Sequence, residues 1–137
     1  MGKVILLTGA PGIGKSTLRE GLVQRLPKLQ AFDYGRLLLE LKATAGMKLT
    51  YEELREKSAT VVGPSDVSAI DEKVIERVGE LRHDSDVLLD SHAFTAEDYG
   101  LRAVPYSLPQ LQRLKLDGII VLHCDPQILN DRNQSNP

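Results

Sequence analysis

The sequence has few of the features that mark secreted, membrane or nucleic-acid-binding proteins. Its single cysteine, Cys124, excludes an internal disulfide and fits a reducing compartment. With 17 basic and 19 acidic side chains the net charge is −2, which argues against a general nucleic-acid binder. The apolar runs are too short for a signal peptide or a membrane span, so we expect a cytoplasmic protein that does not contact membranes. A length of 137 residues fits one compact domain.

What the chain does contain is an alternation of short apolar runs with amphipathic segments. The apolar runs predict buried strands at residues 3–7, 29–32, 87–90 and 118–123. Helical spacing and capping residues predict helices over residues 18–26, 37–46, 50–56, 64–81 and 108–114, with a last one from 126. The segment 91–105 is expected to be a loop. Such alternation predicts an α/β fold with a parallel sheet and a ligand site beyond the carboxyl ends of its strands.

The stretch TGAPGIGKST, residues 8–17, directly follows the first predicted strand. It matches the pattern G-x-x-x-x-G-K-[S/T] of phosphate-binding loops. Glycines let successive backbone N–H groups surround phosphate oxygens, and the start of the following helix adds partial positive charge. The ammonium of Lys15 suits the β and γ phosphates of ATP, and the Ser16 hydroxyl suits Mg²⁺. The expected nucleotide-binding residues are Gly9, Ala10, Pro11, Gly12, Ile13, Gly14, Lys15, Ser16 and Thr17.

Two carboxylates, Asp33 and Asp90, stand at the ends of predicted strands. Asp90 could hold Mg²⁺ directly or through a water molecule, or it could cap the loop that follows. His92, two residues further on, could order a water or a substrate phosphate, or simply hydrogen-bond the loop. These alternatives stay open on the sequence alone.

Several of these segments together resemble the small nucleoside monophosphate kinases. The stretches GAPGIGKST, FDYG at 32–35 and LLDSHAF at 88–94, with Gly100 downstream, are most similar to the archaeal-type adenylate kinases and the adenylate-kinase-like ATPases. The resemblance implies a P-loop three-layer sandwich with a mostly parallel sheet, and ATP and Mg²⁺ as cofactors. It also implies a helical acceptor-binding lobe over residues 34–83 of the single domain.

The same resemblance implies an acceptor side of the site. Arg55 would grip the acceptor phosphate, Gly35 would lie at the acceptor's base, and Arg102 would read the base or its phosphate. Arg132 would bind the transferring phosphoryl group, acting with Lys15 and Asp90 in catalysis. The remaining expected acceptor-binding residues are Asp33 and His92. Each arginine could instead be a solvated surface charge.

Two departures from the family pattern affect these expectations. Arg36 stands where the family has a small hydroxyl or acidic residue, which leaves the acceptor's identity open. Residues 130–137 are expected to begin a lid, and the resemblance implies that the family continues with the rest of the lid, a further strand and a helix. A sheet without that strand would keep one uncovered edge.

The predicted function is Mg²⁺-dependent transfer of the ATP γ-phosphoryl group to a small acceptor, foremost a nucleoside monophosphate. One alternative is an adenylate-kinase-like ATPase that acts as a switch on a protein or ribonucleoprotein partner. Another is a P-loop kinase for a metabolite that is not a nucleotide. In all three cases the glycine stretch binds the nucleotide.

Overall fold

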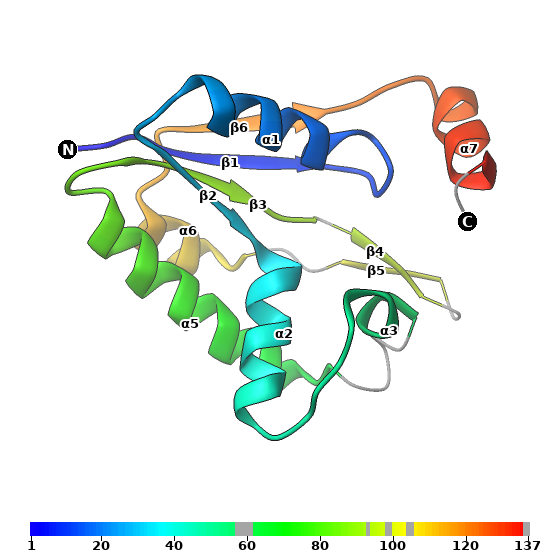
Figure 1. Cartoon of the computed structure of the whole chain (residues 1–137), viewed down its shortest axis with the longest axis horizontal. Helices are drawn as coiled ribbons and strands as arrows, with labels where there is room; N and C mark the ends of the chain where they lie inside the picture. The colour runs from blue at the N-terminus through cyan, green and yellow to red at the C-terminus, as the bar shows by residue number, and fades with distance from the viewer. Residues whose placement is uncertain (57–61, 93, 98–99, 104–105, 136–137) are drawn as a thin grey trace.

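Strands and helices alternate along the chain, as the apolar runs predict. The computed structural model describes residues 1–56, 62–92, 94–97, 100–103 and 106–135 (Figure 1). The strands are β1 (Val4–Gly9), β2 (Leu29–Asp33), β3 (Asp86–Asp90), β4 (Phe94–Glu97), β5 (Gly100–Ala103) and β6 (Gly118–Leu122). The helices are α1 (Lys15–Arg25), α2 (Tyr34–Thr44), α3 (Tyr51–Glu56), α5 (Pro64–Leu81), α6 (Leu108–Leu114) and α7 (Pro126–Ser135).

Four strands form the main sheet in the order β2-β3-β1-β6, and every pairing in it is parallel. The crossover from β1 to β2 runs in one direction across the sheet, whereas the crossovers through α5 and α6 run in the other. Because such connections are right-handed, α1 lies on one face of the sheet and α5 and α6 lie on the opposite face. The predicted α/β class with a mostly parallel sheet is confirmed.

The hydrophobic core lies mainly on the α5 side of the sheet. Alternate residues of β1 and β3 turn to that side, where they join the stripe of α5. The members that are at most 2% exposed are Val4, Ile70, Val74, Val78, Val87, Leu89 and Leu114. Burying each such side chain contributes about 1.5–3 kcal/mol, so this layer fixes the sheet on which the loops at its carboxyl end stand.

The prediction of a loop over residues 91–105 is wrong in part. Residues Phe94–Glu97 and Gly100–Ala103 form the antiparallel pair β4 and β5, in which Phe94 is opposite Ala103. Each strand has only four residues, and a segment that short gives too few positions for an alternation of apolar and polar side chains to stand out.

Strand β6 forms one edge of the main sheet. Its side chains Ile119, Ile120 and Val121 are 56%, 40% and 60% exposed, so apolar surface of this strand faces outward. Residues Pro126–Ser135 form helix α7, which takes in residues 130–135 of the expected lid segment, and residues 136 and 137 lie outside the described residues. None of the helices in the described ranges combines the length and apolar character needed to cross a membrane.

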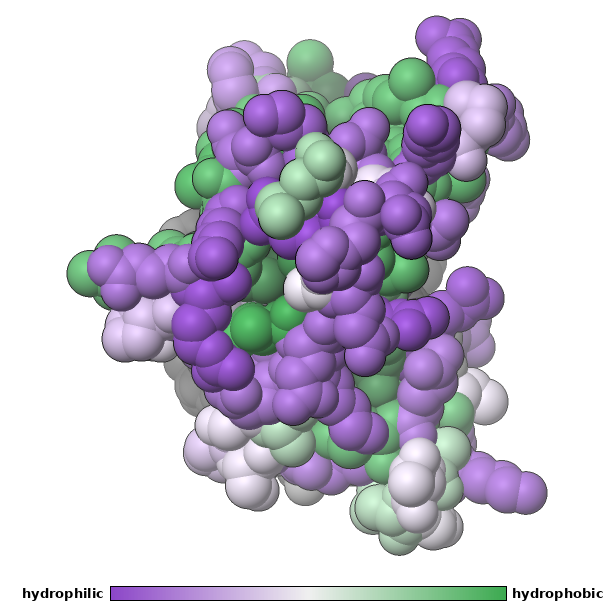
Figure 2. Space-filling view, turned by 90° about the vertical axis from the view of Figure 1, so that its left-hand side faces the viewer, coloured by the Kyte–Doolittle hydropathy of each residue, from purple (hydrophilic) through white to green (hydrophobic). Residues whose placement is uncertain are grey.

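The strands of the main sheet begin at a surface of the molecule that is mainly hydrophilic (Figure 2). Charged side chains at this surface connect the segments that precede the strands. Asp117 accepts hydrogen bonds from the Val4 backbone N–H at 2.9 Å and from the Lys3 ammonium at 3.0 Å. These bonds, the backbone bond first, hold the pKa of Asp117 below its ordinary value. A carboxyl with a lowered pKa in the fold stabilises the fold above its unfolded pKa, and this contribution is lost as the pH falls through the folded value.

We therefore expect the melting temperature of the wild type to fall on acidification below about pH 4 in part through Asp117. The variant Asp117→Asn cannot titrate, so its melting temperature should change less over the same range. Thermal melts from pH 7 to pH 3 measure the difference. Asp84→Asn, an exposed carboxyl in the turn after α5, is the control. An identical pH dependence in all three proteins would contradict the assignment.

Candidate active site

The glycine stretch forms a loop between β1 and α1 that needs glycine at three positions. Gly9, Gly12 and Gly14 have φ angles of 154°, 80° and 104°, which L side chains rarely adopt. An added Cβ at Gly9 would also collide with the Leu122 carbonyl of β6, whereas a Cβ at Gly14 would meet nothing within 4 Å. The space beside Gly14 is therefore open, as a cradle for a ligand requires.

Helix α1 begins without a side chain that caps its N-terminus. Its cap residue is Gly14, no side chain accepts a hydrogen bond there, and the first turn contains no acidic residue. Side chains accept hydrogen bonds from backbone N–H groups at the starts of α2, α3, α6 and α7, supplied by Asp33, Thr50, Ser107 and Asp125, whereas α5 begins at a glycine cap but has the acidic Asp66 in its first turn. The first N–H groups of α1 thus lack the partner that a capping side chain gives elsewhere, and an anion can take that place.

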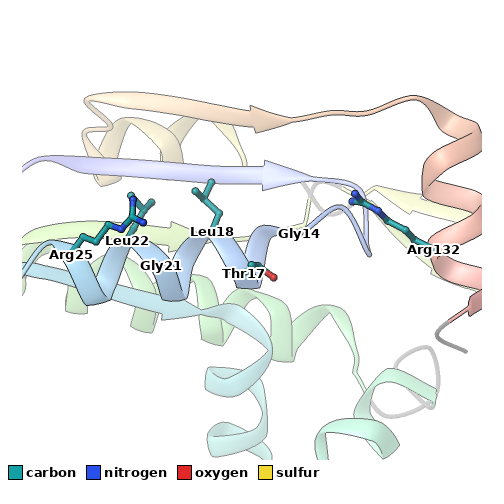
Figure 3. Close-up of a pocket in the computed structure, with 7 residues that line it drawn as sticks. All are labelled: Gly14, Thr17, Leu18, Gly21, Leu22, Arg25 and Arg132. Atoms are coloured by element: carbon teal, nitrogen blue, oxygen red, sulfur yellow. The ribbon is translucent and has the colours of Figure 1, made fainter.

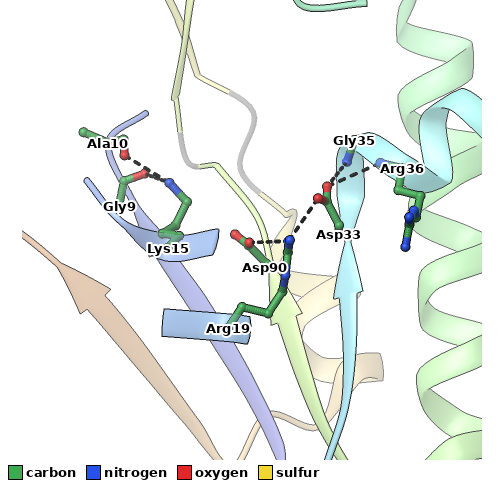
Figure 4. Close-up of polar contacts among 8 residues, drawn as sticks. All are labelled: Gly9, Ala10, Lys15, Arg19, Asp33, Gly35, Arg36 and Asp90. Carbon is green, nitrogen blue, oxygen red and sulfur yellow. Dashed lines mark hydrogen bonds and ion pairs between the residues drawn. The ribbon is translucent and has the colours of Figure 1, made fainter. Parts of the chain in front are cut away.

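Lys15 lies within the loop and is only 5% exposed. Its ammonium donates hydrogen bonds to the carbonyls of Gly9 and Ala10 at 2.9 and 3.0 Å (Figure 4). Burial lowers the pKa of Lys15, and the nearby carboxylate of Asp90 opposes that shift. The lysine thus bridges the loop's own carbonyls, from which a phosphate could draw it away.

Asp33 and Asp90 lie opposite each other at the carboxyl ends of β2 and β3, which confirms that both stand at this edge of the sheet. Asp90 is 7% exposed, and burial raises its pKa, while the charges of Arg19 and Lys15 oppose that rise. Asp33 accepts hydrogen bonds from the backbone N–H groups of Gly35 and Arg36 at 2.9 and 3.3 Å, so it caps α2. The guanidinium of Arg19 contacts both carboxylates (Figure 4).

His92 lies close to this group. Loss of solvation is the main cause that lowers its pKa, and the Lys15 charge acts in the same direction. Asp90 and a hydrogen bond with the Gly9 backbone oppose the shift. His92 therefore lies near enough to be influenced by Lys15 and Asp90, and both alternatives for it, bonding the loop and binding the acceptor, stay predictions.

The residues expected to hold Mg²⁺ have suitable chemistry. The exposed hydroxyl of Ser16 lies in the first turn of α1, and the Asp90 carboxylate ends β3 on the same side of the sheet. Among the described residues, three or more His, Cys, Asp or Glu side chains nowhere gather as a metal site. A magnesium ion held here would depend on nucleotide phosphates and water for its other oxygens, which is its usual mode of binding.

Helix α7 extends the site on the other side of the loop. Arg132 points from α7 toward the glycine loop and lines a pocket of about 620 Å³ together with Gly14, Thr17 and Leu18 (Figure 3). An added Cβ at Gly12 would collide with the side-chain oxygen of Asn133, so α7 lies directly against the loop. The expected binding of a phosphoryl group by Arg132 stays a prediction, and the pocket gives it a position beside the open space at Gly14.

The acceptor side is described less completely. Arg55 lies in α3 and Arg102 in β5, and their side chains are outside the described part of the structure. Gly35 is the second residue of α2. Arg36 lines a second pocket, of about 890 Å³, together with Arg19 and Asp33. The structure thus leaves the expected roles of Arg55, Arg102 and Gly35 as predictions.

A comparison with models of known protein families shows which family the chain belongs to. A family model described as an AAA domain matches residues 8–136, which is nearly the whole chain. The chain belongs to the AAA domain family. The matched range includes the glycine loop, both strand-end carboxylates and α7.

The curated relatives of this AAA domain chain include archaeal adenylate kinases. It is 29% identical to the adenylate kinase of Pyrococcus abyssi over 96% of this chain, and 28% identical to that of Pyrobaculum aerophilum over 97%. It spans 65% and 64% of the length of these two relatives. The expected resemblance to archaeal-type adenylate kinases is confirmed at the level of sequence similarity.

Two solved structures share the fold of this chain. A chain in the structure of the Pnkp1/Rnl/Hen1 RNA repair complex superposes with a TM-score of 0.59 at 18% identity, covering 98% of this chain and 37% of that one. The crystal structure of APE1195 gives a TM-score of 0.52, also at 18% identity, covering 97% of this chain and 66% of that one. At such identities the likeness concerns the fold alone.

Sequence reasoning missed two residues of the site in this AAA domain chain, Arg19 and Asn133. Arg19 follows Ser16 by three positions, so its place on the same side of α1 could have been read from the spacing. Its partners could not, because Asp33 and Asp90 are 14 and 71 residues away along the chain. Asn133 carries no pattern that would relate it to Gly12.

Proposed function

We propose that the chain catalyses Mg²⁺-dependent transfer of the γ-phosphoryl group of ATP to a nucleoside monophosphate. The observation that carries the proposal is the loop at residues 9–17, where open space at Gly14, an uncapped helix start and the Lys15 ammonium come together. The adenylate kinase activity of the curated relatives supports the reaction type. Asp90 beside the loop supports the use of a metal ion.

In the proposed mechanism, the protein positions the reactants and stabilises charge. The backbone N–H groups of the loop and of the first turn of α1 bind the phosphate oxygens of the donor. Lys15 leaves the Gly9 and Ala10 carbonyls and contacts the β and γ phosphates. Ser16 and Asp90 would hold Mg²⁺, which would neutralise charge on the phosphates. Arg132, beside the loop, faces the charge that develops on the transferring group.

The acceptor chemistry follows from the charged groups. A monophosphate is already an anion, so its attack on the γ-phosphorus needs no strong general base. Asp33 caps α2 and also binds Arg19, so it is held for structure rather than for proton transfer. We assign Arg55 and Arg102 to the acceptor because their planar guanidinium groups match phosphate oxygens. An uncharged hydroxyl acceptor would require one of the aspartates to take its proton.

The test is a panel of acceptors incubated with γ-labelled ATP and Mg²⁺, with the products separated by charge. We expect label to appear in a nucleoside diphosphate in step with ADP formation, and to require Mg²⁺ because chelation with EDTA removes the charge neutralisation. Reactions without an acceptor measure background hydrolysis.

The other outcomes identify the rival functions. Free labelled phosphate whose rate no acceptor changes would replace the kinase by a nucleotide-driven switch. Label in a metabolite that is not a nucleotide would move the acceptor to another chemical class. An absence of ATP turnover with every acceptor would overturn the proposed reaction.

A further inference from the structure

We propose that Arg19 is a positioning residue that occupies the carboxylates of Asp33 and Asp90 in the nucleotide-free chain, so that a divalent metal ion reaches Asp90 only together with a nucleotide. The inference rests on the proposed function through the metal-holding role of Asp90. It adds an order of binding and assigns a residue that neither the phosphate-loop pattern nor the kinase resemblance contains.

One guanidinium nitrogen of Arg19 lies between the carboxylates of Asp33 and Asp90. Nη1 of Arg19 lies 2.9 Å from Oδ2 of Asp33 and 2.9 Å from Oδ2 of Asp90 (Figure 4). The side chains of Arg19 and Asp90 are 17% and 8% exposed, so water screens this contact less than it screens a surface ion pair. Because both Oδ2 atoms bond the same nitrogen, they lie within two hydrogen-bond lengths of each other.

The two carboxylates would stay together without Arg19. Asp33 and Asp90 are directly paired in the register of β2 and β3, which fixes their backbones side by side. The other oxygen of Asp33 is held by the N–H groups of Gly35 and Arg36. Oxygen atoms of two adjacent carboxylates are suitable ligands for a divalent cation. The guanidinium thus supplies the positive charge that such a cation would otherwise bring.

Arg19 also lies where it can respond to a nucleotide. It follows Ser16 by three positions on α1, so the two side chains lie on the same side of that helix. Asp90 also interacts with the charge of Lys15, which is hydrogen-bonded to the loop carbonyls. Before a nucleotide binds, the charge of Asp90 is balanced by two protein cations. A metal ion that arrives with a triphosphate brings phosphate oxygens that attract Lys15 away and compete for Asp90.

The experiment is a titration of the nucleotide-free, full 137-residue chain with Mn²⁺, with free Mn²⁺ measured by electron paramagnetic resonance. We expect wild type to leave Mn²⁺ free and Arg19→Met to bind roughly one Mn²⁺ per chain, because the guanidinium that contacts both carboxylates is then gone. Arg25→Met removes the same charge from the same helix and should behave as wild type. Adding Asp90→Asn to Arg19→Met should abolish the gained binding.

Further variants separate charge from folding. Arg19→Lys keeps a cation and should exclude Mn²⁺, whereas Arg19→Gln should bind it as Arg19→Met does; thermal melts establish that each variant is folded. Equal Mn²⁺ binding by wild type, the lysine variant and the neutral variants, or no binding by either neutral variant, would overturn the proposal. The titration contains neither ATP nor acceptor, so a failure of phosphoryl transfer in the acceptor panel does not change its outcome.

Discussion

Replacing Lys15 with alanine is expected to reduce phosphoryl transfer by roughly 10³-fold or more in kcat, which would leave activity near the background. The reason is the position of the ammonium, inside the loop and hydrogen-bonded to the Gly9 and Ala10 carbonyls. No other described lysine donates to these carbonyls, so the charge that should face the β and γ phosphates would be lost. The measurement is initial rates with labelled ATP and the best acceptor of the panel.

The matched control is Lys42→Ala. Lys42 is also a buried lysine, 9% exposed, and its ammonium donates to Asp66 at 2.7 Å in the helical segment that follows β2. Its replacement should lower the melting temperature through the lost ion pair, while kcat stays close to that of the wild type. Turnover by Lys15→Ala at the wild-type rate would remove the phosphate-loop assignment. An equal loss of kcat in both variants would attribute the effect to stability.

The parts of the fold that depend on local signals could be predicted. The strands from which the site is built are short apolar runs, and the loop between β1 and α1 is a fixed spacing of glycines. The sequence also predicted that Asp33 and Asp90 end their strands at the ligand-binding edge of the sheet, whereas the direct pairing of β2 with β3 came from the structure.

The parts that depend on distant contacts could not be predicted. Asp71 of α5 is 7% exposed and accepts hydrogen bonds from the Tyr34 hydroxyl at 2.9 Å and the Gln110 amide at 2.8 Å. Burial is the main cause that raises its pKa. The apolar stripe of α5 gives no sign of this carboxyl, because its partners come from α2 and α6. Arg19 escaped prediction for the same reason.

Replacing Gly14 with alanine is expected to weaken ATP binding by about tenfold or more while the fold is kept. Gly14 has a φ of 104° and open space around its Cβ position, so in the free chain the added methyl group meets no atom within 4 Å. The cost in the free chain is backbone strain, about 1–2 kcal/mol. In the complex the same methyl group would lie at the start of α1, where the loop N–H groups are proposed to surround the phosphates. If the backbone at residue 14 relaxed to relieve its strained φ angle, these N–H groups would turn away from the phosphates.

Gly46 provides the comparison that isolates binding from strain. It follows α2 with a φ of 86°, and an added Cβ there also meets nothing within 4 Å, so Gly46→Ala carries a similar backbone strain outside the proposed site. Calorimetric titration with Mg²⁺ and ATP, together with thermal melts, should show equal losses of stability but a loss of affinity in Gly14→Ala alone. Wild-type affinity in both variants would mean that the N-terminus of α1 is not where the polyphosphate binds, and the proposed function would lose its main support. Equal losses of affinity would instead attribute the effect to general strain, because only one of these two glycines adjoins the loop that holds Lys15.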